Sequence, residues 1–255
     1  MRVIWVIAFN TFRELIRDRI LYGLLIFAVL LIGVSLALGQ LSYAEQARIS
    51  LDFGFSAINL CAVILAIFLG SSLVAKEIEL RTIYSLLARP IGRVQFMFGK
   101  FLGLLGIILA VSVGLSVVLS IVIYFLGNPW DFDCFAAFFG ILLEAIVMLS
   151  VTMLFGMLTK PLLASTYSLG LFFIGRWLDS LNFIVQKSES LAFIKFNTII
   201  QHSLPNLEKF NWRTYVLIKD QVSLNEVATA TLYAFGWTGT FIFAAALIFR
   251  KKDFV

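Results

Sequence analysis

Charge is what this chain has least of. Among its 255 residues only 14% are charged, whereas 61% are hydrophobic, and the mean hydropathy is +0.98. A soluble domain usually carries about 25% charged residues. Phenylalanine alone contributes 26 residues. The composition therefore predicts an all-α polytopic membrane protein. The net charge of +5 does not by itself indicate a nucleic-acid partner, because in a membrane protein basic residues are distributed unevenly between the two sides of the membrane.

Histidine and cysteine are almost missing as well. His202 is the single histidine, and Cys61 and Cys134 are the only cysteines. The chain has no Cys-x-x-Cys or His-x-x-x-His spacing of the kind that holds zinc. We therefore expect no metal site and no bound cofactor. His202 is interpreted as a polar loop residue, and the two cysteines are interpreted as small buried hydrophobes.

The sequence also lacks a phosphate-binding loop. The pattern G-x-x-x-x-G-K-S/T supplies backbone amides and a lysine to the phosphates of ATP. Its nearest approach is Gly99-Lys100, which has Val94 where the first glycine belongs and Phe101 where the hydroxyl belongs. No Ser/His, Ser/Lys or paired-aspartate arrangement lies in the apolar runs, so no catalytic residue is predicted. The chain is not expected to hydrolyse ATP by itself.

Six apolar runs are present, each near the ~20 residues that cross a bilayer as a helix. They lie at 20–39, 55–75, 101–126, 135–158, 162–178 and 228–249. The first run ends without an Ala-x-Ala site, so we expect it to remain in the protein. Residues 2–19 form an amphipathic pattern, which predicts an interfacial helix that either anchors the chain at the membrane surface or also packs against a partner.

The basic residues predict the orientation of these spans. With both termini cytoplasmic, the inner side carries thirteen of the twenty basic residues, namely Arg2, Arg13, Arg17, Arg19, Lys76, Arg81, Arg89, Arg93, Lys100, Lys160, Arg250, Lys251 and Lys252. The short outer loop with Asp131 and Asp133 has no basic residue. We therefore expect a multi-pass protein of a bacterial cytoplasmic membrane.

Glu144 is the ionisable residue that lies deepest in a predicted span. It stands nine residues into the fourth span, roughly midway through the apolar layer at ~1.5 Å per residue. An intramembrane carboxyl group is a functional candidate, as a substrate contact or a proton-linked residue. The sequence shows no partner for it, and a protonated carboxyl group that bonds a neighbouring helix is the structural alternative. Arg176 and Asp179 are interpreted as interface anchors.

Small residues recur at helical spacing on two spans. Such stripes let helices approach closely in lipid. They predict tight contact between the second and third spans, either with each other or across a dimer axis. The residues are Ala62, Ala66 and Gly70 on the second span and Gly99, Gly103, Gly106, Ala110 and Gly114 on the third.

A polar, patterned stretch separates the second and third spans. Ile83, Leu86 and Leu87 share one helical face, and the pattern ends at Arg89-Pro90, because the residue before proline avoids the α region. This stretch resembles the loop between spans two and three in permeases of the type-2 ABC exporter family. The matching residues are Glu77, Glu79, Thr82, Leu86, Leu87, Pro90, Arg93, Gly99 and Lys100, while Arg81 stands where the family often has glycine.

The resemblance implies a permease that pairs with a second permease, a copy or a homologue, and with two separate ABC ATPase subunits. ATP and Mg would enter through those subunits, and membrane lipids would surround the complex. The stretch would be a coupling helix that docks on the ATPase through Glu77, Glu79, Arg81, Thr82, Ile83, Leu86, Leu87, Arg89, Pro90 and Arg93. Leu204-Pro205-Asn206-Leu207-Glu208 is similar to a segment of the subgroup associated with multicopper-enzyme maturation or gliding motility.

One permease domain is expected over residues 1–255, with an interfacial helix at 1–19, a coupling loop at 76–100 and an outer segment at 179–227. The outer segment is either a solvated cap with short helices or a lid over the exit. The leading function is ATP-driven export of an unidentified, amphipathic or lipid-like substrate. The alternatives are a non-transporting anchor or mechanotransmission component, and an intramembrane enzyme built around Glu144.

Overall fold

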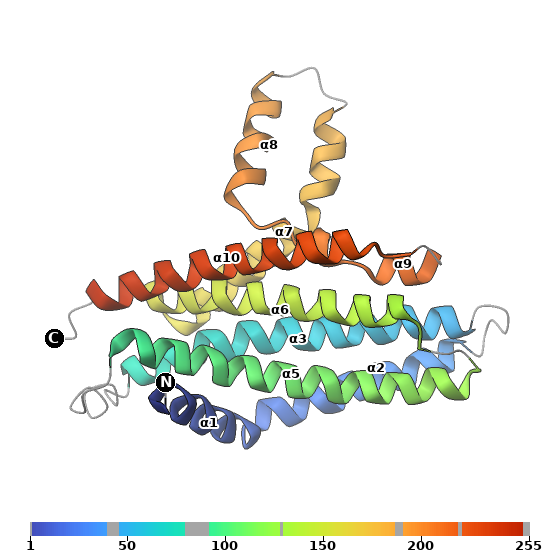
Figure 1. Cartoon of the computed structure of the whole chain (residues 1–255), viewed down its shortest axis with the longest axis horizontal. Helices are drawn as coiled ribbons and strands as arrows, with labels where there is room; N and C mark the ends of the chain where they lie inside the picture. Colours follow the sequence, from blue (N-terminus) through green and yellow to red (C-terminus); the bar gives the residue numbers. More distant parts are fainter. Residues whose placement is uncertain are drawn as a thin grey trace.

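A computed structural model describes residues 2–39, 46–79, 92–127, 130–186, 191–218 and 221–251. Within these ranges the secondary structure is helical (Figure 1). The helices are α1 (Arg2–Ile16), α2 (Arg19–Gly39), α3 (Gln46–Glu79), α5 (Arg93–Phe125), α6 (Phe132–Leu158), α7 (Pro161–Gln186), α8 (Leu191–Ser203), η1 (Glu208–Phe210), α9 (Arg213–Ile218) and α10 (Leu224–Lys251). The prediction of an all-α polytopic membrane protein is confirmed.

Five of these helices are long and apolar enough to cross a membrane. They are α3, α5, α6, α7 and α10, and the count rises to six if α1 and α2, which meet at 64°, form one bent span. Only Thr159 and Lys160 separate α6 from α7, as expected for a tight hairpin between the fourth and fifth spans. The described helices thus agree with the predicted order of spans.

Two helices are much longer than their apolar runs. α3 begins at Gln46 and ends at Glu79, and α5 begins at Arg93 rather than near position 101. The 34 residues of α3 extend about 50 Å, whereas the hydrocarbon core is about 30 Å thick. Hydropathy locates only the lipid-facing portion, so the sequence prediction missed the helical ends that carry Arg48, Asp52 and Glu77.

The core of the bundle lies between α3 and α6. Most side chains in the membrane windows of these two helices are buried, whereas α7 and α10 leave most of theirs exposed. Ala62 and Ala66 on α3 are fully buried, and a methyl group at Gly70 would lie 3.2 Å from Leu149 and Thr152 of α6. The small residues of α3 therefore permit its close approach to α6.

The glycines of α5 have a different neighbour from the predicted one. A methyl group at Gly99 would lie 2.8 Å from Ile7, and one at Gly103 would lie 2.7 Å from the Ala8 carbonyl oxygen. Gly106 likewise faces Phe12, whereas Gly114 faces open space. The predicted contact between the second and third spans is present, since Gly54 of α3 lies against Leu119 of α5. Gly99, Gly103 and Gly106 do not make this contact, because their close neighbours belong to α1.

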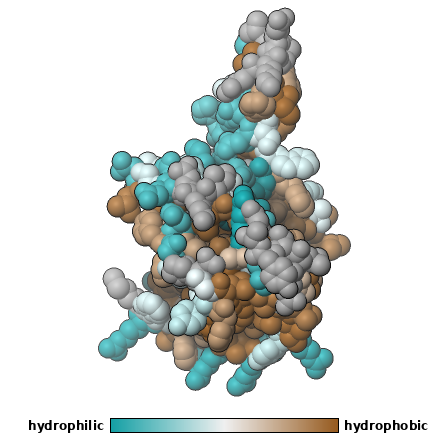
Figure 2. Space-filling model, turned by 90° about the vertical axis from the view of Figure 1, so that its right-hand side faces the viewer, coloured by the Kyte–Doolittle hydropathy of each residue, from teal (hydrophilic) through white to brown (hydrophobic). Residues whose placement is uncertain are grey.

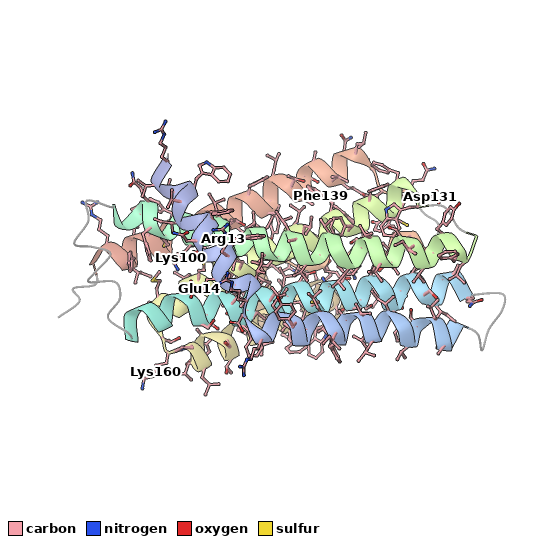
Figure 3. All side chains as sticks on the ribbon, turned by 90° about the horizontal axis from the view of Figure 1, so that it is seen from below. Arg13, Glu14, Lys100, Asp131, Phe139 and Lys160 are labelled. Carbon is pink, nitrogen blue, oxygen red and sulfur yellow. The ribbon has the colours of Figure 1, made fainter. Side chains whose placement is uncertain are left out.

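α1 has three faces rather than two. Ala8, Thr11 and Leu15 are buried, and the nearby glycines show that this face lies against α5. Trp5 and Phe9 are more than half exposed beside it, and Arg13 lies 4.7 Å over the Phe9 ring. The third face carries the exposed Asn10 and Glu14. Figure 3 shows α1 crossing the bundle near the end that holds Lys100 and Lys160, opposite Asp131.

The segment between the last two spans is partly ordered into helices. The end of α7 and α8 form a hairpin that projects sideways from the bundle, and Figure 2 shows it standing out when the bundle is viewed end-on. The side chains of Asn182 and Asn197 join its two arms through a 3.2 Å hydrogen bond. After α8 the chain returns to the bundle and forms η1 and α9. The expected short helices of the outer segment are thus present.

Candidate functional site

Glu144 lies at the meeting point of three helices. Its side chain is 1% exposed, and its Oε2 accepts a 2.6 Å hydrogen bond from Asn59 Nδ2 of α3. Arg176 of α7 donates a second hydrogen bond of 2.9 Å from Nη2 to the same oxygen. The sequence interpretation that Glu144 has no partner is therefore wrong. Its partners lie 85 and 32 residues away along the chain, so sequence spacing did not indicate them.

Arg176 connects this carboxylate to the outer segment. Its side chain is only 15% exposed, and Nη2 also donates to Asn59 Oδ1 at 3.1 Å. The other nitrogen, Nη1, lies 3.5 Å from Glu208 Oε2. The planar fork of a guanidinium group supplies these donors in one rigid unit. The expectation of a simple interface anchor is therefore wrong for Arg176, which holds two carboxylates together.

A segment of nine residues, 204–212, is inserted among the helices and is called the inserted segment below. Leu207, Phe210 and Trp212 are almost completely buried. The Leu207 amide donates a 3.1 Å hydrogen bond to the Gly175 carbonyl of α7. This part of the chain is thus packed in the protein, and the solvated cap expected for the outer segment does not describe it.

Two glycines make room for the inserted segment. A methyl group at Gly140 of α6 would lie 2.3 Å from the Phe210 carbonyl oxygen. One at Gly175 would lie 2.8 Å from Leu207 and 2.9 Å from the Pro205 carbonyl oxygen. Any larger side chain at either position would push against backbone, which cannot move aside as a flexible side chain can. The close fit depends on glycine at these two positions.

Hydrogen bonds tie the inserted segment to its surroundings at several points. The Asn206 backbone amide donates to the Tyr233 hydroxyl of α10 at 2.8 Å, and Arg213, which directly follows the segment, donates from Nη1 to Ser56 Oγ of α3 at 2.6 Å. Within the segment, Asn211 Nδ2 donates to Glu208 Oε1 at 2.6 Å. Asp179, the other expected anchor, accepts a 2.6 Å hydrogen bond from Asn206 Nδ2. Ser56 and Asn59 lie about one helical turn apart on α3. α3 therefore contacts both Arg213, which follows the inserted segment, and the ion pair of Glu144 and Arg176.

A small, partly enclosed cavity lies beside Glu144. Its volume is about 10 Å³, room for about one water molecule, and its wall includes Asn59, Arg176, Phe210, Asn211 and Arg213. No described residue donates a hydrogen bond to Glu144 Oε1. The cavity is thus lined by both signs of charge, with two arginines and one carboxylate.

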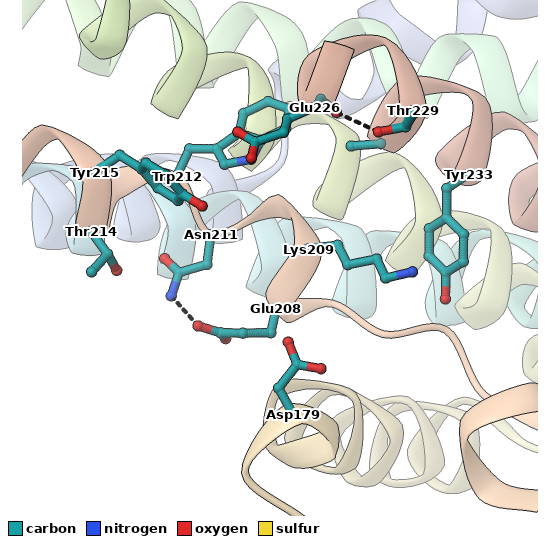
Figure 4. Close-up of a pocket in the computed structure, with 11 residues that line it drawn as sticks. Asp179, Glu208, Lys209, Asn211, Trp212, Thr214, Tyr215, Glu226, Thr229 and Tyr233 are labelled. Carbon is teal, nitrogen blue, oxygen red and sulfur yellow. Dashed lines mark hydrogen bonds between the residues drawn. The ribbon is translucent and has the colours of Figure 1, made fainter. Parts of the chain in front are cut away.

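Larger cavities open on the outer side of the inserted segment. One of about 530 Å³ is lined by carboxylates and aromatic rings, including Asp179, Glu226 and Tyr215 (Figure 4). Lys209 Nζ lies 4.5 Å over the Tyr233 ring in its wall. A second cavity of about 540 Å³ shares Asp179 and Glu208 with the first. Asn211 lines both the first outer cavity and the small one beside Glu144, so the inserted segment borders both.

The residues of the predicted coupling stretch are described only at its ends. Glu77 and Glu79 lie in the last turn of α3, and Arg93 begins α5. The residues from Arg81 to Pro90 lie outside the described part of the chain. Lys100 is buried, with Nζ 5.7 Å from the Phe96 ring centre. α3 thus runs without a break from Asn59 in the buried network to Glu77, a distance of about 27 Å.

Long apolar helices around an intramembrane ion pair define an all-α integral membrane protein with a polar centre. The family model described as ABC-2 family transporter protein matches residues 5–254. The chain therefore belongs to the ABC-2 transporter family, whose members are membrane permease subunits that work with an ABC ATPase subunit and are not normally catalytic themselves. A comparison with individually curated proteins gave no match.

Several residues of the site carried a signal that the sequence reasoning did not use. Asn59 and Arg176 lie inside predicted apolar runs, where a polar side chain is costly and usually partnered. Pairing each with Glu144 would have required knowing which helices touch. Ser56 gave a weaker signal because it lies near the start of the second predicted span, where polar residues are common, and Arg213 gave none because it lies in the outer segment.

Proposed function

We propose that this chain is the permease subunit of an ATP-driven exporter. It would couple ATP hydrolysis by two separate ATPase subunits to the outward movement of an amphipathic or lipid-like substrate. The observation that carries the proposal is the family match over residues 5–254, together with the patterned stretch between α3 and α5. Both helices extend beyond the thickness of a hydrocarbon core, which supports a role for them as levers between an ATPase and the membrane.

The coupling mechanism follows from the sequence of the stretch. Ile83, Leu86 and Leu87 would bury an apolar ridge in a groove of the ATPase. Arg81 and Arg89 would meet acidic or polar groups at its rim, where charges steer and orient a partner. Closure of the two ATPase subunits around ATP would then tilt α3 and α5. Because ATPase subunits of this kind act as a pair, a second permease, a copy or a homologue, would complete the complex.

The nature of the cargo is inferred from the exposed surface. α7 and α10 present large apolar side chains outward, among them Phe173, Trp177, Leu232 and Phe243. Among the described residues the buried charged and amide groups around Glu144 bond to one another, and most other buried polar groups are isolated hydroxyl groups on separate helices. An apolar surface of this kind favours a lipid-like substrate that moves along a groove. The complex would lie in a bacterial cytoplasmic membrane with both termini cytoplasmic.

The second candidate function is mechanotransmission without transport. The hairpin of α7 and α8 projects from the bundle, and within the described chain α8 packs mainly on α7 (Figure 1). Such an element could carry a conformational change to an envelope partner. Stimulation of ATP hydrolysis by added lipids or solutes would favour transport, whereas hydrolysis insensitive to all of them would favour mechanotransmission.

The coupling claim is tested by combining Leu86→Asp with Arg89→Glu. The double variant should insert in the membrane normally and lose stimulation of the ATPase, because a buried leucine and a rim charge are both removed. ATPase activity in nanodiscs, with and without the permease, measures the effect. The matched control is Lys160→Glu, which reverses an exposed charge on the α6–α7 connection and should leave stimulation unchanged. Normal stimulation by the double variant would refute docking through this stretch.

A further inference from the structure

We infer that the inserted segment (residues 204–212) is an outer gate, that the network of Asn59, Glu144 and Arg176 holds it shut, and that movement of α3 releases it. The inference rests on the proposed function, because it takes the force on α3 from the ATPase. It adds a gate, its lock and the helix that links the lock to the coupling stretch.

The inserted segment has the position that a gate requires. It borders both the small cavity beside Glu144, through Phe210 and Asn211, and an outer cavity of about 530 Å³, through Glu208, Lys209 and Asn211. It enters from the outer side as a short 3₁₀ turn rather than as a spanning helix. Withdrawal of this segment would therefore join the two cavities without unfolding any of the long helices.

Most polar contacts that hold the segment come from one stretch of α7. A backbone hydrogen bond joins Leu207 to Gly175, Arg176 reaches Glu208, and Asp179 accepts a hydrogen bond from Asn206. Arg176 is held in turn by Glu144 and Asn59. Buried charges that lose their partners are strongly destabilising. An opened arrangement of the network would therefore need water around its charges in place of the lost partners.

α3 is the element through which release would be driven. It contributes Asn59 to the network and Ser56 to Arg213, which directly follows the inserted segment. The same helix continues to Glu79 at the start of the coupling stretch. A movement of α3 that displaced its side chains by about 1–2 Å would lengthen the hydrogen bonds of Asn59 and of Ser56 beyond their usual range. Motion at the coupling end of α3 would thus weaken the hydrogen bonds that hold the inserted segment in place.

The central test measures how fast a water-soluble thiol reagent reaches the cavity beside Glu144. Ala137 is 1% exposed and lines that cavity from α6, so Ala137→Cys adds a thiol without altering the gate. Cys61 and Cys134 are replaced by alanine in this background. The permease is reconstituted with its ATPase subunits in nanodiscs and treated with a membrane-impermeant maleimide. The labelling rate should rise about tenfold during ATP turnover, as for a shifted closed–open equilibrium.

Two variants address the lock and the gate separately. Glu144→Gln preserves the shape of the side chain and removes its charge, so it should raise labelling of Ala137→Cys without ATP. Gly175→Ala wedges the inserted segment outward and should do the same. Gly170→Ala lies on the same helix with open space around it and should leave labelling low. A second probe, Leu207→Cys on the gate itself, should follow the same order.

The outcomes separate this inference from the proposed function. If the permease fails to bind or stimulate the ATPase, the proposed function falls. If it stimulates the ATPase while Ala137→Cys and Leu207→Cys label at the same rate with and without ATP, the gate falls and the proposed function stands. If ATP raises labelling but Glu144→Gln and Gly175→Ala behave like Gly170→Ala, the network and the inserted segment are not the lock.

Discussion

Arg176 shows why single residues matter so much in the middle of a membrane bundle. Its guanidinium group lies within hydrogen-bond distance of Glu144 and Asn59 and 3.5 Å from Glu208. A lysine would offer a compact charge that cannot occupy the same fork. Without this group, the Glu144 carboxylate would be left buried with Asn59 as its single described partner. The stability of the bundle centre therefore depends on the pairing, whatever its role in gating.

The first residue-scale prediction concerns Arg176→Met. The variant should destabilise the folded permease by about 3–5 kcal/mol, the usual cost of leaving one member of a buried ion pair unpaired. A lower midpoint of thermal unfolding in detergent, followed by fluorescence, measures it. Combining Arg176→Met with Glu144→Leu should recover most of the loss, because two apolar residues need no partner. Lys195→Met, on the exposed face of α8, is the control and should leave the midpoint unchanged.

At the scale of elements, α1 is more than a membrane anchor. Its buried face lies on Gly99, Gly103 and Gly106 in the first half of α5, immediately after the coupling stretch. Its exposed Trp5 and Phe9 face away from α5, where lipid would cover them. One face of α1 thus packs on the protein, and another face anchors the helix in the membrane. The amphipathic pattern predicted an anchor that could in addition pack on a partner, and within this chain α1 packs on α5.

The element-scale prediction is that Gly103→Ala displaces α1. The new methyl group would lie 2.7 Å from both the Ala8 carbonyl oxygen and Thr11 Cβ, and overpacking of this kind costs about 1–3 kcal/mol. Ala8→Cys, in a background without Cys61 and Cys134, should then react faster with maleimide. Gly114→Ala is the matched control, since it lies on the same helix with nothing within 4 Å. Equal reactivity in the two variants would contradict close packing of α1 at Gly103.

For the whole molecule, the two ends of the bundle differ in charge. The start of α1, the end of α10, the end of α3 and the start of α5 lie toward one end, and α9 lies toward the other (Figure 1). Lys100 and Lys160 mark the first end, and Asp131 marks the opposite one (Figure 3). Lys100 and Lys160 are among the thirteen of twenty basic residues that the sequence assigns to the inner side, and Asp131 lies in a loop assigned to the outer side.

The whole-molecule prediction concerns orientation. Lys160→Cys and Asp131→Cys place thiols at exposed positions on opposite ends of the bundle. In intact cells an impermeant maleimide should label Asp131→Cys and should reach Lys160→Cys only after lysis. Labelling of Lys160→Cys in intact cells would reverse the proposed topology and would put the coupling stretch on the wrong side for an ATPase.

The sequence by itself determined the helical membrane class, the order of the spans and the family resemblance. These features depend on local hydropathy and on a short motif, such as Glu77 to Arg93, that needs no knowledge of packing. Only the tertiary structure decided that Glu144 has partners on two other helices, that Gly99 and Gly103 accommodate α1, and that residues 204–212 enter the bundle. The physical reason is distance along the chain, because each of these contacts joins segments whose spacing in the sequence says nothing about their separation in space.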